Sequence, residues 1–196
     1  MRNSSSVSLF VVGAMLAGAG GVLAAPATYK VDPRHTYPSF VADHAGGMSL
    51  WRGKFNSTSG TIVLDKQAQA GSVDITVDVA SIDFGLDDMN AHAKKADPGM
   101  FDVAQFPTAT YKGKLANFKD GKPTEVHGEL TLHGVTKPLN LTIRSFMCKP
   151  NNKQQDWCGA DAVGKFNRDD FGVSFGKAFG FKMDVTVEIQ VEATAQ

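Results

Sequence analysis

The chain has 196 residues, enough for one domain with a sizeable core, and its composition is that of a globular protein rather than a disordered one. Its 20 Lys and Arg side chains balance 20 Asp and Glu side chains, so the formal net charge is zero. Because there is no basic excess to neutralise a phosphate backbone, the charge argues against a nucleic-acid partner.

The N-terminal stretch 1–24 has the features of a secretory signal peptide. Arg2 supplies a positive end, 7–23 form an apolar run of 17 residues, and Val22-Leu23-Ala24 is a small-residue cleavage motif. The alternative is a membrane anchor, but a span needs about 20 apolar residues and this run is shorter. We expect cleavage after Ala24, which leaves 25–196 as an exported domain in the periplasm.

Three strands are expected in the first half of the mature chain. The first covers 29–31 and resumes at 39–43, with prolines at the interruption that predict a bend. The second covers 61–64. The third covers 73–79, where Val and Ile alternate with Asp and Thr, the pattern of a strand with one buried face.

The segment 87–96 differs in kind and predicts a short helix. Asp87 is a candidate N-cap, Lys94 and Lys95 favour the C-terminal end, and Asp97-Pro98-Gly99 stops the helix. Met89, His92 and Ala93 fall on one face, which we expect to lie against the strands.

Alternation returns in the second half, where strands are expected over 108–118, 124–133, 139–143, 160–167 and 183–192. Asp120-Gly121 and Gly134 are typical of tight turns between antiparallel strands, because glycine takes a positive φ without strain.

The only two cysteines, Cys148 and Cys158, flank a polar segment with no strand pattern. In an exported protein such a pair predicts a disulfide that closes this loop. The spacing does not suit a redox-active pair at a helix start, so we expect a structural bridge.

These elements add up to an all-β domain of about eight antiparallel strands with one short helix. Strands with one apolar face must bury it, and a closed barrel does so without leaving free edges. The interior of a barrel of this size is filled by side chains or holds one small ligand. The alternation alone leaves a sandwich open.

Several motifs, taken in order, resemble those of the YceI-like polyisoprenoid-binding family. Residues 29–36 read Y-K-V-D-P-R-H-T, close to the family's opening motif but with Thr where Ser is usual. The others are K-F-N followed by G-T-I within 54–62, M-F-D-V-A-Q-F-P-T-A-T-Y at 100–111, the hairpin motif G-E-L-T-L-H-G-V-T-K-P at 128–138 and R-D-D-F-G-V at 168–173. The resemblance implies a single lipocalin-like barrel in the periplasm that binds a long-chain isoprenoid, such as a quinone or polyprenyl lipid.

Inward alternation and aromatic content then predict the residues that line the ligand site. The apolar candidates are Phe40, Phe55, Ile62, Val77, Phe101, Leu130, Leu141, Phe171 and Val187. The polar candidates for contact with a ligand head group are His35, His44 and His92. For His35, a bond to the backbone near the strand bend is favoured over ligand contact. Glycine-spaced phenylalanines at 166–181 would form either a flexible apolar mouth or a plug at the barrel's end.

Other kinds of site have little support in the sequence. The five histidines show no metal-binding spacing, and His127 and His133 on one strand are too far apart to share an ion. No catalytic motif pairs a nucleophile with a base. We therefore expect a binding protein, not an enzyme, with no cofactor beyond a bound lipid or quinone. The alternatives are an accessory protein to a b561-type membrane cytochrome and an enzyme acting on a lipid. A homodimer is left open.

Overall fold

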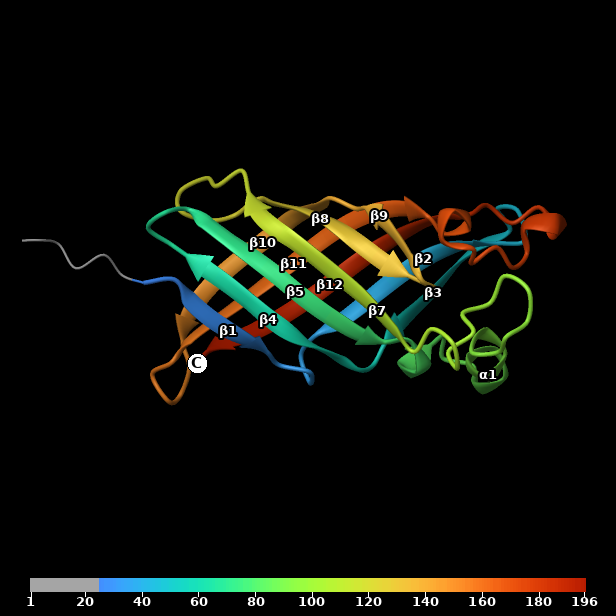
Figure 1. Ribbon diagram of the computed structural model, residues 1–196, viewed down its shortest axis with the longest axis horizontal. Coiled ribbons are helices and arrows are strands. Elements are labelled where there is room, and N and C mark those ends of the chain that lie inside the picture. Colours follow the sequence, from blue (N-terminus) through green and yellow to red (C-terminus); the bar gives the residue numbers. More distant parts are fainter. Residues whose placement is uncertain (1–24) are drawn as a thin grey trace, which may run out of the picture.

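The computed structural model of the protein describes residues 25–196 as an elongated barrel (Figure 1). The predicted signal peptide at 1–24 lies outside the described residues. None of the helices found between residues 25 and 196 has the length and hydropathy needed to cross a bilayer.

Twelve strand segments between residues 25 and 196 pair antiparallel in one sheet. They are β1 (Ala27–Val31), β2 (Tyr37–His44), β3 (Ser49–Phe55), β4 (Thr58–Asp65), β5 (Ala70–Asp78), β6 (Ile82–Asp83), β7 (Thr108–Ala116), β8 (Glu125–Leu132), β9 (Val135–Pro138), β10 (Leu141–Pro150), β11 (Asp156–Asn167) and β12 (Asp184–Ala195).

Four pairs of consecutive strands each share one position in the barrel wall, which reduces the twelve segments to eight wall strands. Two of these pairs are β3 with β4, which pair with β2 and β1, and β5 with β6, which pair with β4 and β3. Strands β1 and β2 both pair with β12, β1 with its C-terminal part and β2 with its N-terminal part. Likewise β9 and β10 pair with successive parts of β8. Because β1 also pairs with β4, the sheet closes on itself. The predicted antiparallel barrel of about eight strands is confirmed, and the sandwich alternative is wrong.

The two ends of the barrel differ. One end, here called the helix end, carries α1 (Asp87–Ala93) and the three 3-10 helices η1 (Val79–Ser81), η2 (Arg168–Phe171) and η3 (Lys177–Phe179). The other, the hairpin end, carries the β10–β11 turn and the end of β12 (Figure 1). The barrel wall therefore consists of regular strands, and the helical and irregular segments lie mainly at the helix end.

The helix α1 is shorter than predicted and begins differently. It ends at Ala93 rather than at residue 96, and Leu86, not Asp87, occupies the N-cap position without a side-chain cap. The reason for the early end is local, since the backbone N–H of Phe101 donates to the carbonyl of Ala93 and draws the chain back. The polar residues after Ala93, which were predicted to form the last helical turn, belong to the segment that turns back to this bond.

The β8–β9 turn follows the predicted glycine chemistry. Both His133 and Gly134 have positive φ, 51° and 74°, as a two-residue hairpin turn requires. A Cβ added to Gly134 would lie 2.8 Å from a ring carbon of Phe106. Glycine is therefore needed here for its conformation and for its lack of a side chain.

The disulfide between Cys148 and Cys158 is present, with the two Cα atoms 4.0 Å apart. The expectation of an irregular loop between them is wrong, because β10 continues to Pro150 and β11 begins at Asp156. The two cysteines face each other directly across this hairpin. Lys149 and Pro150 are both exposed, so the end of β10 shows no alternation between buried and exposed positions, and its residues show no strand pattern.

Candidate ligand-binding cavity

A cavity of about 390 Å³ runs through the barrel, and strand alternation creates it. The side chains of β12 show this most clearly, because every second residue faces inward. These residues are Val185, Val187, Ile189, Val191 and Ala193. Eight residue steps at about 3.3 Å each give a lined length of roughly 26 Å along the strand. The cavity is long and narrow, and aliphatic or aromatic side chains form most of its wall.

The hairpin end of the cavity is closed. Tyr29, Leu64 and Ala193 are at most 3% exposed and pack against the disulfide. The hydroxyl of Tyr29 donates to Asp156 at 2.7 Å, and burial together with this bond raises the pKa of Tyr29. Burial alone would raise the pKa of Asp156, but hydrogen bonds from Lys66 and Tyr29 lower it instead. The Asp156 carboxylate thus holds in place the Tyr29 side chain, which helps to close this end of the cavity.

The same region contains the only grouping of potential metal ligands found within residues 25–196, Cys148, Asp156 and Cys158. The two sulfurs are bonded to each other. In this oxidised form the thiolate ligands that a metal ion needs are not offered.

At the helix end the lining is aromatic and only half-buried, which places the opening there. The ring of His44 lies edge-on to Trp51 and to Phe181, with centroids 4.9 and 5.3 Å apart. Trp51 in turn contacts Phe84 at 5.6 Å. We call His44, Trp51, Phe84 and Phe181 the mouth. All four line the cavity.

Charged groups also reach the cavity near the mouth. Asp43 is buried, and its carboxylate accepts the backbone N–H groups of Gly46 and Lys182, both at 2.9 Å. Arg168 is half-buried and donates to the carbonyls of Val173 and Phe175, both at 2.8 Å. Burial lowers the pKa of Arg168, although a guanidinium stays charged at any physiological pH. These bonds fix the loops around the opening.

His44 differs from these two side chains because its ring nitrogens make no hydrogen bond to any group within residues 25–196, while its ring faces the cavity. It therefore combines an apolar packing surface with a free polar atom at the boundary between the cavity and solvent.

The structure brings most of the predicted lining residues together. Eight of the nine apolar candidates contribute to the cavity wall: Phe40, Phe55, Ile62, Val77, Phe101, Leu130, Leu141 and Val187.

Phe171 does not line the cavity, and its assignment is corrected. It lies on η2, a turn that Gly172 ends with a φ of 76°, and so it does not follow strand alternation. Its ring is 1% exposed and packs edge-on against Phe166 at 5.4 Å, with Val79 and Val173 nearby. Phe171 belongs to a core cluster that also contains the lining residues Ala109, Leu132 and Val173.

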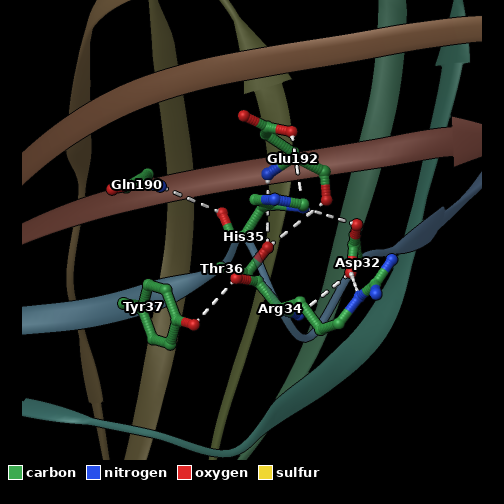
Figure 2. Close-up of polar contacts among 7 residues, drawn as sticks. All are labelled: Asp32, Arg34, His35, Thr36, Tyr37, Gln190 and Glu192. Atoms are coloured by element: carbon green, nitrogen blue, oxygen red, sulfur yellow. Dashed lines mark hydrogen bonds and ion pairs between the residues drawn. The ribbon is translucent and has the colours of Figure 1, made fainter. Parts of the chain in front are cut away.

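His35, predicted as a head-group contact, lies on the outer surface of the barrel (Figure 2). Its Nδ1 is 2.7 Å from an oxygen of Asp32 and 3.9 Å from one of Glu192. The neighbouring Thr36 hydroxyl accepts the N–H of Glu192 at 3.2 Å and donates to its carbonyl at 3.3 Å. The hydrogen bond with His35 lowers the pKa of Asp32. This motif therefore fastens the β1–β2 bend to β12, and the His35 ring contacts carboxylates instead of a ligand or the backbone.

His92 is not in the cavity wall either. Its ring lies 5.1 Å from that of Phe175, and its Nε2 is 3.5 Å from Asp97. Of the three predicted histidines only His44 reaches the cavity, because α1 turns His92 towards the loops instead of the barrel.

Sequence reasoning missed several residues of the mouth. Trp51 lies on β3, a strand that side-chain alternation did not predict, and Phe84 lies in the irregular segment after β6. Asp43 and Arg168 looked like surface charges. The glycine-spaced phenylalanines divide between the two predicted roles. Phe175 and Phe181 line the cavity, whereas Phe171 is core and Phe179 points into solvent.

A closed antiparallel barrel around a long apolar tunnel defines a class of ligand-enclosing barrels. Residues 29–195 match the model of the YceI-like domain, and the chain belongs to that family. It is 31% identical over 199 residues to a UPF0312 protein of Pectobacterium atrosepticum, with all of both chains covered.

Solved structures show the same barrel. BcnA of Burkholderia cenocepacia superposes with a TM-score of 0.64 at 25% identity, covering 84% of this chain and 99% of that one. A polyisoprenoid binding domain from Saccharophagus degradans, implicated in plant cell wall breakdown, gives a TM-score of 0.61 at 17% identity and covers 86% and 98%. The second likeness is one of fold.

Proposed function

We propose that this protein is an exported, periplasmic carrier that holds the long apolar chain of an isoprenoid, a quinone or a polyprenyl lipid, inside its barrel. The observation that carries the proposal is the continuous inward lining of β12 from Val185 to Ala193. Each CH₂ group moved from water into such a tunnel gains about 0.8 kcal/mol. A long narrow cavity closed at one end suits a chain better than a compact molecule.

The polar head of the ligand belongs at the mouth. A chain inserted tail-first ends against the closed hairpin end, which leaves its head among His44, Trp51, Phe84 and Phe181. Of these, His44 has ring nitrogens without a partner in the described structure and can donate to or accept from a head-group oxygen. Asp43 and Arg168 are already engaged in fixing the loops.

Two further points support the proposal. The Saccharophagus degradans domain with the same fold is named for polyisoprenoid binding, which is an argument by analogy. The predicted signal peptide would deliver the chain to the periplasm, beside membranes that contain such lipids. The role is binding without turnover.

The test is native mass spectrometry of the purified exported protein, followed by solvent extraction and analysis of the extract. We expect up to one apolar molecule per chain, released chemically unchanged. If the protein carries no apolar molecule and, after delipidation, does not take up added quinones or polyprenyl lipids, the carrier role is wrong. A chemically altered product that accumulates with time would indicate an enzyme instead.

A further inference from the structure

Exposed apolar side chains gather at the helix end of the barrel. Large hydrophobic side chains that stay mostly exposed are rare between residues 25 and 196, and five stand out. They are Met48 (81% exposed), Leu50 (57%), Leu86 (52%), Met147 (66%) and Phe179 (76%). Only Met147 lies towards the hairpin end, beside the disulfide. Three of the others lie on two segments that border the mouth.

These two segments, 46–52 and 177–182, form one surface that we call the lip. They touch, since a Cβ added to Gly46 would lie 3.1 Å from the carbonyl oxygen of Gly180. Each segment places one aromatic ring in the cavity wall, Trp51 from the first and Phe181 from the second. The first segment also points Met48 and Leu50 outward, and the second points Phe179 outward. The apolar surface of the cavity thus continues over the lip to the outside of the protein.

The charges of the lip have one sign. Its two segments contain Arg52, Lys177 and Lys182 and no Asp or Glu. Lys177 is paired with Asp169 of η2, which offsets one of the three cations. Two carboxylates lie within three residues of the lip along the chain. Asp184, two residues after Lys182, is exposed and accepts a hydrogen bond from Asn167 at 3.3 Å. Asp43 is buried and already accepts two backbone N–H groups.

We propose that the lip docks the open end of the barrel on the surface of a lipid bilayer, a proposal that rests on the carrier role. Met48, Leu50 and Phe179 insert at the boundary between head groups and acyl chains, and Arg52 and Lys182 lie against lipid phosphates. Apolar side chains that project singly between cations are typical of surfaces that bind membrane interfaces.

The chemistry of the ligand favours a bilayer over a protein partner. A long isoprenoid chain is insoluble in water, so it must pass between membrane and cavity without crossing solvent. With the lip on the bilayer, the mouth faces the lipid phase and the tail has an apolar route across Trp51 and Phe181. The closed hairpin end has neither the mouth aromatics nor this cluster.

The experiment is flotation of the exported protein, its N-terminus verified by sequencing, with vesicles of phosphatidylethanolamine and phosphatidylglycerol. We expect the wild type to float with the vesicles. Met48→Ser and Phe179→Ser should each weaken the partition coefficient about tenfold, because each removes one inserted side chain. Lys182→Gln should weaken it about fivefold on vesicles with the anionic lipid and leave it unchanged on vesicles without it.

Met147→Ser is the matched control, since it removes another largely exposed methionine, at 66% against 81% for Met48, at the far end. All substituted positions are exposed, so thermal unfolding should match the wild type. A wild type that stays in solution, or an equal loss of partition in Met147→Ser, overturns the proposal. So does binding that requires a membrane protein in the vesicles.

The outcomes separate docking from the carrier role. A protein that retains an extractable lipid but does not float is a carrier without this docking surface. A protein that floats through its lip but never holds lipid refutes the carrier role and leaves docking in place.

Discussion

Substitution of Val187 by Gln tests whether the interior of the barrel is a ligand tunnel or a solid core. Val187 lies near the middle of β12, faces the cavity and pairs in register with Phe40 of β2. In a tunnel, the new amide contacts the lipid chain and loses its water when lipid binds. Burying an amide without a partner costs about 1–3 kcal/mol, so lipid affinity should fall roughly 10- to 100-fold.

The stability of the same variant should fall much less. Water can enter the empty cavity and solvate the amide, so we expect a loss below about 1 kcal/mol and a drop in Tm of about 2–4 °C. Phe171→Gln provides the contrast, because this ring is 1% exposed within a packed core cluster and does not itself line the cavity. Truncating such a ring costs about 3–5 kcal/mol. Its folded fraction should still retain lipid.

The assay is extracted lipid per folded protein, measured beside thermal unfolding, with Val187→Leu as an apolar control of similar length. We expect lipid to be lost only in Val187→Gln. If Val187→Gln keeps the wild-type lipid load, the cavity is not the binding site. If it destabilises the protein as much as Phe171→Gln does, the interior is a filled core and the reasoning fails.

Three further predictions concern processing, the disulfide and the strand bend. The mature N-terminus should be Ala25 by N-terminal sequencing, and an intact Met1 in the membrane fraction would contradict this. Replacing Cys148 and Cys158 by Ser should cost roughly 2–3 kcal/mol, or about 5–10 °C in Tm, and two reactive thiols in the denatured, non-reduced wild type would show that the bond does not form. Asp32→Asn should cost about 0.5–1 kcal/mol at neutral pH, since its hydrogen bond with His35 is partly exposed. Because this bond lowers the pKa of Asp32 in the folded state, its contribution is present above the unfolded pKa and is lost as pH falls through the folded one. Urea unfolding across pH should therefore show the two proteins converging in acid, and a constant difference at all pH values would refute the link.

The regular part of the fold could be predicted because it depends on local alternation. Val187 and Leu130 lie in strands with one apolar face, and their inward facing follows once the barrel closes. The turn at Gly134 follows from glycine's tolerance of positive φ. For such strand positions, the two-residue period and closure of the sheet together decide whether a side chain points inward or outward.

The mouth could not be predicted in the same way, because its residues lie where alternation fails. Phe171 and Phe181 look alike in sequence, yet a left-handed Gly172 turns one into the core while the other faces the cavity. His35 matches a family motif, but its contact with Glu192 depends on a pairing between segments far apart in the chain. Only the three-dimensional structure separates these cases.

The pairing of β12 with β1 and β2 also has a consequence for biogenesis. Tyr29 pairs with Ala195, so the seam of the barrel joins the first and last described strands. While a nascent chain lacks β12, the edge of β11 that later pairs with β12 has no partner, and the apolar inner surface is exposed to water. Closure therefore has to wait until β12 has been synthesised, and such long-range pairing is intrinsically slow. During that interval the open sheet can aggregate, and only a chain that has completed β12 encloses the cavity.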